Sequence, residues 1–441
     1  MARERYSLQR GLIHMPMETL NFEKLKTDIY RDLMERVDLE KLSRLAPEKG
    51  RPAVAEMIRE IAAATRVPFN QVEREQLQAD LLDEVFGLGP LEPLLRDLSI
   101  SDILVNNKND VFIERAGLLE KANVSFRDDR HLLQIIDRVV SAVGRRIDES
   151  SPMVDARLAD GSRVNAVIPP LALDGPALSI RRFGYGPLSP DSLLAYQTLS
   201  PEMLEVLAAA VRARISVLIS GGTGAGKTTL LNMLSSYIPE GQRIITIEDA
   251  AELQLDHENL VRLETRTANV EGQGAVRQRQ LVINSLRMRP DRIIIGEVRG
   301  EEAFDMLQAM NTGHEGSMCT IHANTPRDAL TRLENMVAMT NLNFPDKAVR
   351  QQVAAAITLV VQVSRLSDGT RKVTNISEIT GVDESVISMH EIFTFQKKGI
   401  SNGKVVGAFQ ATGIRPRFLE QLRISGVHLP NHLFDRVMEV A

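Results

Sequence analysis

Cysteine is nearly absent from this chain: Cys319 is the single one among 441 residues. A lone thiol excludes an intrachain disulfide, and so low a cysteine content is typical of proteins in a reducing cytosol. No run of the sequence approaches the roughly 20 apolar residues that a helix needs to span a bilayer. We therefore expect a cytoplasmic protein that has no membrane-spanning helix of its own.

Aromatic residues and excess positive charge are also scarce. The chain has no tryptophan, aromatic residues make up 4%, and the formal net charge is −5. Nucleic-acid-binding domains usually offer aromatic stacking surfaces or a basic surplus, so we expect no nucleic acid partner. The hydrophobic content of 43% and the charged content of 25% are typical of globular domains, and the length predicts two or three of them.

The sequence does contain the phosphate-binding loop pattern G-x-x-x-x-G-K-[ST], at residues 221–228. A predicted strand at 213–220 and a predicted helix at 227–236 supply the context that the motif needs, which disfavours a glycine turn without a ligand. We expect Lys227 to reach the β- and γ-phosphates of ATP and Thr228 to offer its hydroxyl to Mg²⁺. The expected nucleotide-binding residues of this loop are Gly222, Thr223, Gly224, Ala225, Gly226, Lys227, Thr228 and Thr229.

The patterning along the chain predicts three parts and a linker. Residues 1–75 carry apolar side chains at helical spacing and predict a small helical bundle. Residues 80–185 predict an α+β domain with mostly antiparallel strands, and residues 186–200, which include two prolines, predict a linker. Residues 201–441 predict an α/β core with a parallel sheet around the phosphate loop, then a β meander and a return to helix over the last 30 residues.

Two carboxylates follow apolar strands of this predicted parallel sheet. Residues 292–296 lead to Glu297, and residues 244–247 lead to Glu248. Because the carboxyl ends of parallel strands form the ligand crevice, we expect Glu297 to hold the metal ion together with Thr228, and Glu248 to activate the attacking water. The sequence leaves open which acid is the base, and a surface acid at a strand end is the alternative for Glu297.

His322 follows a third predicted strand, at 317–321, and we expect it beside the γ-phosphate or the carboxylates of the metal shell. A zinc site shared with His314 lacks further ligands. A buried histidine with satisfied hydrogen bonds is the alternative.

Arginines gather in three clusters. The clustered residues are Arg181 and Arg182, then Arg262 and Arg266, then Arg277, Arg279, Arg287 and Arg289. Guanidinium groups beside a phosphate site neutralise charge that develops on transfer, often from an adjacent subunit. Ordinary surface salt bridges are the alternative for most of them.

Four segments in order resemble the Walker A, Asp box, Walker B and His box of the secretion-superfamily ATPases: GGTGAGKTTLLN, IITIEDAAEL, RMRPDRIIIGEVRG and GHEGSMCTIHANTPRDALTRLE. With segments that resemble the family's N-terminal domain, the similarity covers about residues 80–400. It is nearest to the tight-adherence (Tad/Flp) pilus motor ATPases, since a helical bundle fits that subgroup and the four-cysteine zinc module of other branches is missing. The VirB-type conjugation ATPases are the nearest rival.

The resemblance implies a homohexamer in which a PAS-like α+β domain and a RecA-like P-loop core enclose the nucleotide. It implies that Arg163, Arg181 and Arg182 reach the phosphates from the N-terminal domain, and that Arg262 and Arg266 act across or near the same cleft. The implied activity is Mg²⁺-dependent ATP hydrolysis that works on inner-membrane platform proteins to assemble a pilus, with retraction left open. The alternatives are translocation of DNA or effector proteins by a type IV secretion system, a RecA-like nucleic-acid-binding protein, and a nucleotide switch without hydrolysis.

Overall fold

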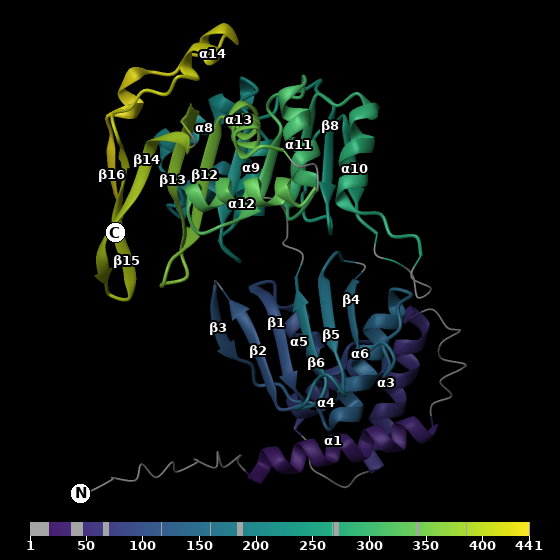
Figure 1. The fold of residues 1–441 in the computed structure, drawn as a ribbon. Helices are drawn as coiled ribbons and strands as arrows, with labels where there is room; N and C mark the ends of the chain where they lie inside the picture. The colour runs from purple at the N-terminus through teal and green to yellow at the C-terminus, as the bar shows by residue number, and fades with distance from the viewer. Residues whose placement is uncertain are drawn as a thin grey trace, which may run out of the picture. The chain divides into compact units, whose positions relative to one another are not determined.

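A computed structural model describes residues 17–36, 47–64, 70–115, 117–158, 160–182, 188–266, 268, 273–340, 344–384 and 386–440. The chain divides into two compact units, Met1–Arg115 with Leu119–Arg182, and Ala116–Leu118 with Phe183–Ala441 (Figure 1). Each unit has an apolar core of its own. In the described part of the chain no helix is both long and apolar enough to cross a membrane.

The first unit begins with amphipathic helices that share an apolar core. The helices of this unit are α1 (Met17–Arg36), α3 (Pro47–Ala64), α4 (Gln71–Phe86), the 3₁₀ turn η1 (Gly89–Leu91), α5 (Glu92–Arg96) and α6 (Asp129–Ala142). Ile29 and Leu33 of α1, Ile58 of α3, and Leu77 and Leu81 of α4 are buried against one another. Helices α1, α3 and α4 therefore pack together, although α4 continues past residue 75 and residues 37–46 lie outside the described residues.

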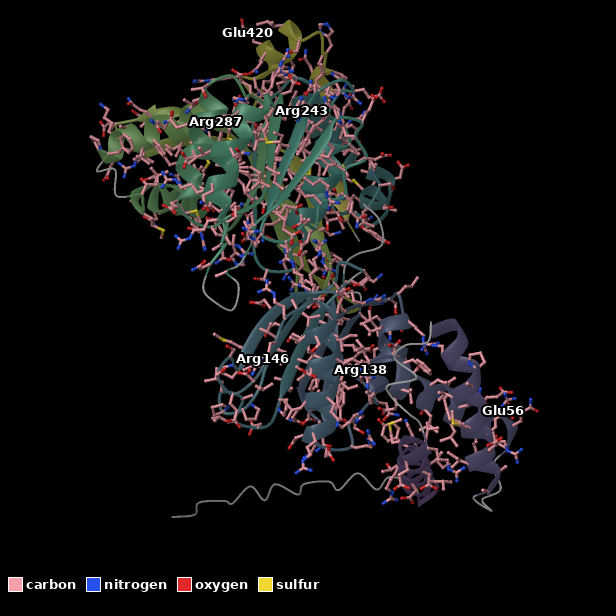
Figure 2. The ribbon with its side chains drawn as sticks, turned by 90° about the vertical axis from the view of Figure 1, so that its right-hand side faces the viewer. Glu56, Arg138, Arg146, Arg243, Arg287 and Glu420 are labelled. Atoms are coloured by element: carbon pink, nitrogen blue, oxygen red, sulfur yellow. The ribbon has the colours of Figure 1, made fainter. Side chains whose placement is uncertain are left out.

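A buried polar contact joins this helical layer to the rest of the first unit. Glu84 of α4 and His131 of α6 are both about 5% exposed or less, and Glu84 Oε2 lies 2.8 Å from His131 Nε2. Arg138, labelled in Figure 2, donates from α6 to the carbonyls of Glu84 and Gly87. A buried carboxylate needs such partners, so α4 is bound to α6 rather than being a detached appendage.

The remainder of the first unit is a six-stranded sheet in the order β3-β2-β1-β6-β5-β4. Its strands are β1 (Ile100–Asn107), β2 (Asp110–Arg115), β3 (Leu118–Lys121), β4 (Met153–Arg157), β5 (Arg163–Val167) and β6 (Ala177–Arg181). The pairings β1–β2, β1–β6, β5–β6 and β4–β5 are antiparallel, as expected from the short turns. Ile135, Ile136 and Val139 of α6 pack on the buried face of this sheet.

The second unit is built on a ten-stranded sheet in the order β16-β15-β14-β13-β12-β7-β11-β10-β8-β9. Its strands are β7 (Val217–Gly221), β8 (Ile244–Glu248), β9 (Leu260–Glu264), β10 (Arg292–Val298), β11 (Met318–His322), β12 (Leu359–Arg365), β13 (Arg371–Asp383), β14 (Val386–Ser401), β15 (Lys404–Ala411) and β16 (Val437–Val440). The six strands from β12 to β9 run parallel, and β13 to β16 continue the sheet in antiparallel pairs. The predicted parallel core and the start of the meander are confirmed.

Helices cover both faces of the parallel part of this sheet (Figure 1). They are α7 (Pro190–Ala195), α8 (Pro201–Arg212), α9 (Lys227–Ser235), α10 (Gln278–Ser285), α11 (Glu302–Asn311), α12 (Pro326–Ala338) and α13 (Asp346–Ala356), with a 3₁₀ turn η2 (Leu286–Met288). In β7, Val217 and Ile219 pack with α8 and α9, whereas Leu218 packs with α11 and α12. All five residues of β7 are buried, as expected for a central strand covered on both sides.

Two segments differ from their expected structure. The predicted linker includes α7, whose Leu193 is buried in the core of the second unit. The expected return to helix over the last 30 residues is wrong. Only α14 (Leu419–Ile424) and a short 3₁₀ turn, η3 (Asn431–Phe434), are helical among the described residues there, and β16 pairs with β15 at the sheet edge. Apolar residues spaced around short turns do not distinguish an edge strand from a helix.

Gly316, in the turn before β11, offers a test of this packing. Its φ is +78°, and a Cβ there would lie 2.7 Å from both Arg214 Cα and Arg292 Nη1. We predict that Gly316→Ala lowers the free energy of unfolding by about 2–5 kcal/mol, since left-handed strain and overpacking add. Gly313→Ala is the matched control, because φ is +100° there but no atom lies within 4 Å of the added carbon. Its cost should stay at about 1–2 kcal/mol in urea unfolding, and equal effects of the two variants would contradict this account.

Candidate functional site

The phosphate-loop sequence forms a tight turn between β7 and α9. Gly224 has φ +67° and Gly226, which caps α9, has φ +97°, so both adopt the left-handed conformation that glycine accepts without strain. A Cβ on Gly221 would lie 2.5 Å from the carbonyl oxygen of Val363 on the neighbouring strand β12. Lys227 Nζ donates to the carbonyl of Gly222 at 3.1 Å. The turn therefore leads directly into a helix N-terminus, the arrangement that suits an anion.

The parallel register brings the predicted site residues to the same edge of the sheet. His322 pairs with Gly221 across β11 and β7, and β10, which carries Glu297, is the next strand along. Glu248 ends β8, one strand further. Neighbouring strands lie about 4.8 Å apart. Measured across the sheet, the backbones of His322, Glu297 and Glu248 are therefore roughly 5, 10 and 14 Å from β7.

Glu297 is held ionised by its surroundings. Arg299 Nη2 donates to Glu297 Oε2 at 2.8 Å. Burial opposes ionisation, but this hydrogen bond and the Arg299 charge outweigh it, and the pKa of Glu297 falls below its usual value. The charge of Lys227 acts in the same direction. The carboxylate therefore keeps the negative charge that a metal ligand needs.

Glu248 lies in the opposite environment. It is 3% exposed, and its Oε1 accepts the backbone N–H groups of Glu252 and Leu253 at 2.9 and 3.0 Å. Its Oε2 is buried and has no hydrogen-bond partner in the described part of the chain. Desolvation raises the pKa of Glu248 against these hydrogen bonds. A Cβ on Gly296 would lie 2.9 Å from Glu248 Cγ, so β10 leaves room for this side chain.

His322 is partly buried, and burial followed by the charge of Lys227 lowers its pKa. A histidine with a lowered pKa is neutral near pH 7 and retains one donor and one acceptor nitrogen. The neighbouring Thr320 Oγ1 donates to the carbonyl of Gly296 at 2.6 Å. This bond ties β11 to β10 where the β10 register shifts, between Ile295 and Val298.

Arg299 was missed by sequence reasoning. Besides Glu297, it contacts Asp249 at 3.2 Å and so joins the ends of β8 and β10. A cavity of about 430 Å³ adjoins this pair and is lined also by Arg266. The available signal was its position two residues after Glu297, but sequence spacing does not reveal a contact with Asp249.

In the second unit, Arg262 and Arg266 each contact a backbone carbonyl of a neighbouring loop. Arg262 Nη2 donates to the carbonyl of Leu253 at 2.9 Å, and Arg266 Nε to the carbonyl of Gly274 at 2.6 Å. Both leave the sheet at or after β9, four strands and about 19 Å from β7. Their backbones are therefore remote from the phosphate loop of the same chain, although the charge of Arg262 acts on Glu248 and opposes the rise of its pKa.

Arg279 forms ordinary salt bridges. It pairs with Glu301 at 2.9 Å and Asp305 at 2.7 Å. The alternative prediction of structural ion pairs is confirmed for this residue.

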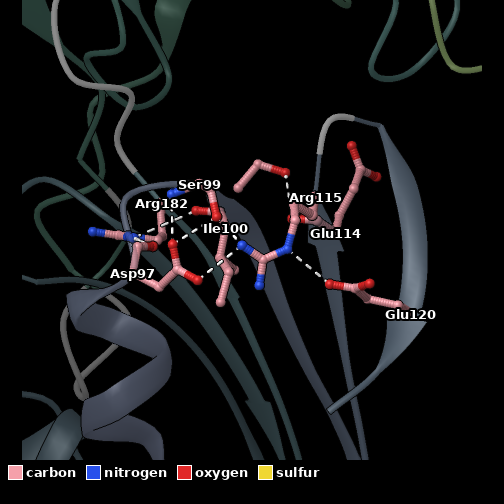
Figure 3. Close-up of polar contacts among 8 residues, drawn as sticks. Asp97, Ser99, Ile100, Glu114, Arg115, Glu120 and Arg182 are labelled. Carbon is pink, nitrogen blue, oxygen red and sulfur yellow. Dashed lines mark hydrogen bonds and ion pairs between the residues drawn. The ribbon is translucent and has the colours of Figure 1, made fainter.

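The arginines predicted from the N-terminal domain lie in the first unit. Arg163 and Arg181 are opposite each other on β5 and β6, and Arg181 Nε lies 3.1 Å from Asp102 Oδ1. Arg182 donates to the carbonyls of Asp97 and Ile100 (Figure 3). These three residues share one end of the sheet with a polar cluster.

Asp97 organises that cluster. It accepts hydrogen bonds from Ser99 and then from Arg115, which hold its pKa at about 2. Arg115 also contacts Glu120, as Figure 3 shows. The resulting network fixes the backbone whose carbonyls Arg182 contacts.

The two acids should show opposite pH dependence of stability, measured without nucleotide or divalent cation. The pKa of Glu248 is higher in the folded state than its unfolded value near 4.5. The free energy of unfolding therefore falls as pH rises from the unfolded pKa to the folded pKa. Glu248→Gln should therefore gain stability relative to wild type as pH rises from 4 to 8. The pKa of Glu297 is lower in the folded state than in the unfolded state. Its ionised form therefore stabilises the fold above the unfolded pKa, and this stability is lost as pH falls through the folded pKa. Glu297→Gln should be less stable than wild type at pH 7 and approach wild type in acid. Urea unfolding from pH 3 to 8 measures both, and the same trend in the two variants would refute the assigned environments.

Comparisons with known proteins place this site in a family context. Residues 84–416 match the family described as type II/IV secretion system protein. The chain is 40% identical over 303 residues to a putative conjugal transfer protein of Mycobacterium tuberculosis, covering 67% of this chain and 86% of that protein. It is 32% identical over 323 residues to the type IV secretion system protein VirB11 of Brucella suis, covering 67% and 89%.

Among solved structures, the chain resembles the VirB11 ATPase of the Brucella suis type IV secretion system in complex with sulphate. The identity is 30% and the TM-score 0.35, with 66% of this chain and 95% of that chain covered. Since the family match spans most of the sequence, this chain belongs to the type II/IV secretion system protein family.

Proposed function

We propose that this protein is a Mg²⁺-dependent ATPase with a RecA-like P-loop core. The observation that carries the proposal is the shared sheet edge, where the glycine turn with Lys227 meets Glu297 and His322. A glycine turn without a ligand would not need a carboxylate and a histidine at the same ends of the neighbouring strands.

The loop residues hold the polyphosphate. Backbone N–H groups of residues 222–229 surround the phosphates, and the N-terminus of α9 adds its dipole. Lys227 exchanges its present contact with the Gly222 carbonyl for the β- and γ-phosphate oxygens. Thr228 and Thr229, in the first turn of α9, supply hydroxyl groups.

The residues present fit a magnesium ion. Mg²⁺ prefers oxygen ligands, and Thr228 and the ionised Glu297 offer them. When bound, the ion would neutralise charge on the β- and γ-phosphates. Glu297 is a glutamate where most phosphate-loop enzymes have aspartate, and its bond to Arg299 orients it.

Glu248 is the better candidate for the general base. Its Oε1 is fixed by two backbone donors, which leaves Oε2 to accept the proton of the attacking water. A raised pKa brings a carboxylate nearer to the value that proton abstraction at neutral pH requires. His322, neutral at pH 7, is suited to donate a hydrogen bond to the γ-phosphate.

Mechanical work follows if the first unit responds to the nucleotide. We propose that Arg163, Arg181 and Arg182 contact the phosphates when the units close, through charge-assisted hydrogen bonds that hydrolysis then removes. Arg262 and Arg266, remote from the loop of their own chain, would act toward a neighbouring subunit. Six such subunits in a ring at the cytoplasmic face of the inner membrane would act on membrane platform proteins.

The cargo has two candidates. The Tad/Flp resemblance favours assembly of a pilus, with retraction left open, whereas the relatives named for conjugal transfer and type IV secretion favour translocation of DNA or effector proteins. Deleting the gene in its host and scoring surface pili and DNA transfer in parallel separates the two. Loss of pili with normal transfer supports the pilus motor, and the reverse result supports the translocase.

Loss of the loop lysine should abolish turnover. We predict that Lys227→Ala lowers kcat for ATP at least about 100-fold, since its charge acts on the transferring phosphoryl group. Phosphate release by the full chain is the measurement. Lys404→Ala, at an exposed position in β15, is the control and should keep wild-type turnover. Intact turnover in Lys227→Ala would remove the proposed activity.

Glu248 and Glu297 should fail in different ways. Glu248→Gln should lower kcat by about 10²- to 10⁴-fold while the nucleotide still binds, because only proton abstraction is lost. Glu297→Gln should instead raise the Mg²⁺ concentration needed for half-maximal turnover. Titrations of Mg²⁺ and of a fluorescent ATP analogue measure both, and exchanged phenotypes would reverse the two roles.

A further inference from the structure

The hairpin formed by β12 and β13 packs against the outer side of the phosphate loop. The Val363 carbonyl of β12 occupies the space beside Gly221, where no Cβ would fit. Arg371, the first residue of β13, donates from Nε to the carbonyl of Gly224 at 3.3 Å. Its Cγ also lies 3.9 Å from the position that a Cβ on Gly226 would take. Arg371, 147 positions away in sequence from Gly224, therefore stabilises the backbone on the outer side of the loop.

The carbonyl that Arg371 contacts belongs to the peptide group that joins Gly224 to Ala225. In a phosphate-binding nest the N–H groups point toward the anion and the carbonyls away from it. A guanidinium group on the outer carbonyl fixes the orientation of this peptide and polarises its N–H toward the phosphate side. Gly224 needs such support, because a glycine at φ +67° has many alternative conformations.

Arg365, the last residue of β12, adds a second guanidinium group at the same point. It is the register partner of Arg371, and its Nη1 would lie 3.4 Å from a Cβ on Gly224. A polyphosphate on the other side of the loop would be attracted to both guanidinium groups.

The hairpin that carries these arginines is firmly held. Asp368 Oδ1 accepts from the backbone N–H and hydroxyl of Thr370, and its Oδ2 accepts from the Val405 N–H of β15 at 2.8 Å. On the next residue of β13, the buried Lys372 Nζ donates to the Gln197 carbonyl at 2.7 Å. Arg371 therefore lies next to a turn that several hydrogen bonds hold in place.

We propose that Arg371, assisted by Arg365, is a positioning residue that sets the phosphate loop for nucleotide binding from within the same chain. The inference rests on the proposed function, since it assumes that the loop binds the polyphosphate of ATP. It assigns to the β12–β13 hairpin a role that the four recognised motifs do not include. Its action is on ground-state and transition-state binding alike, because the loop holds the phosphates in both.

The test compares Arg371→Ala, Arg371→Lys and a control in the full chain. Arg371→Ala should weaken binding of a fluorescent ATP analogue and raise KM for ATP roughly tenfold, with kcat within about threefold of wild type, as expected for loss of one charged hydrogen bond. Arg371→Lys, which restores the charge, should recover most of the affinity. Arg436→Ala removes an exposed arginine that pairs with Glu202 and should leave both constants unchanged.

The outcomes separate this inference from the proposed function. If wild type hydrolyses ATP and Lys227→Ala does not, but Arg371→Ala matches Arg436→Ala in affinity and KM, the hairpin inference is wrong and the ATPase stands. If Arg371→Ala lowers the unfolding midpoint and kcat together and the lysine variant does not restore affinity, the residue is structural and the inference is again wrong. If wild type neither binds nor hydrolyses ATP, the proposed function itself fails.

Discussion

Parallel pairing of β7, β11, β10 and β8 is the constraint on which the site depends. Because parallel strands end at the same edge, a phosphate loop after β7 and acids after β8 and β10 become neighbours in space. Each of these strands is mostly apolar and buried, as a sheet covered by helices on both faces requires. Burial of these strands stabilises the sheet, and their parallel pairing places Lys227, Glu248 and Glu297 at its carboxyl end.

Two carboxylates at that edge differ because their surroundings differ. Glu297 keeps its charge beside Arg299, whereas Glu248 is drawn into the protein and is bound by backbone N–H groups on one oxygen alone. Opposite shifts in pKa follow from ion pairing in the first case and desolvation in the second. Such a pair can divide metal binding from proton transfer, which one shared environment could not do.

Much of this was predictable from local sequence. The loop at 221–228 and the strands before Glu248, Glu297 and His322 are encoded by contiguous apolar runs and by glycine spacing, and the structure has them. The last 30 residues were predicted wrongly, because β16 forms only by pairing with β15, which no local pattern records.

Long-range contacts set the limit of sequence reasoning in the site as well. The sequence does not predict the roles of Arg299 and Arg371, because only the fold brings them to their partners, Asp249 and Gly224. The predicted Arg262 shows the converse: it contacts Leu253 in the segment that follows β8, but its own strand β9 lies four strands from β7, which leads to the phosphate loop.

The most direct test is an experimental structure of the full chain with Mg²⁺ and a slowly hydrolysed ATP analogue. The account predicts that the γ-phosphate lies within about 3 Å of Lys227 Nζ, that Thr228 and Glu297 face the magnesium ion, and that Glu248 faces the attacking water. A nucleotide bound elsewhere, or one bound at the loop with both carboxylates turned away from it, would contradict the account.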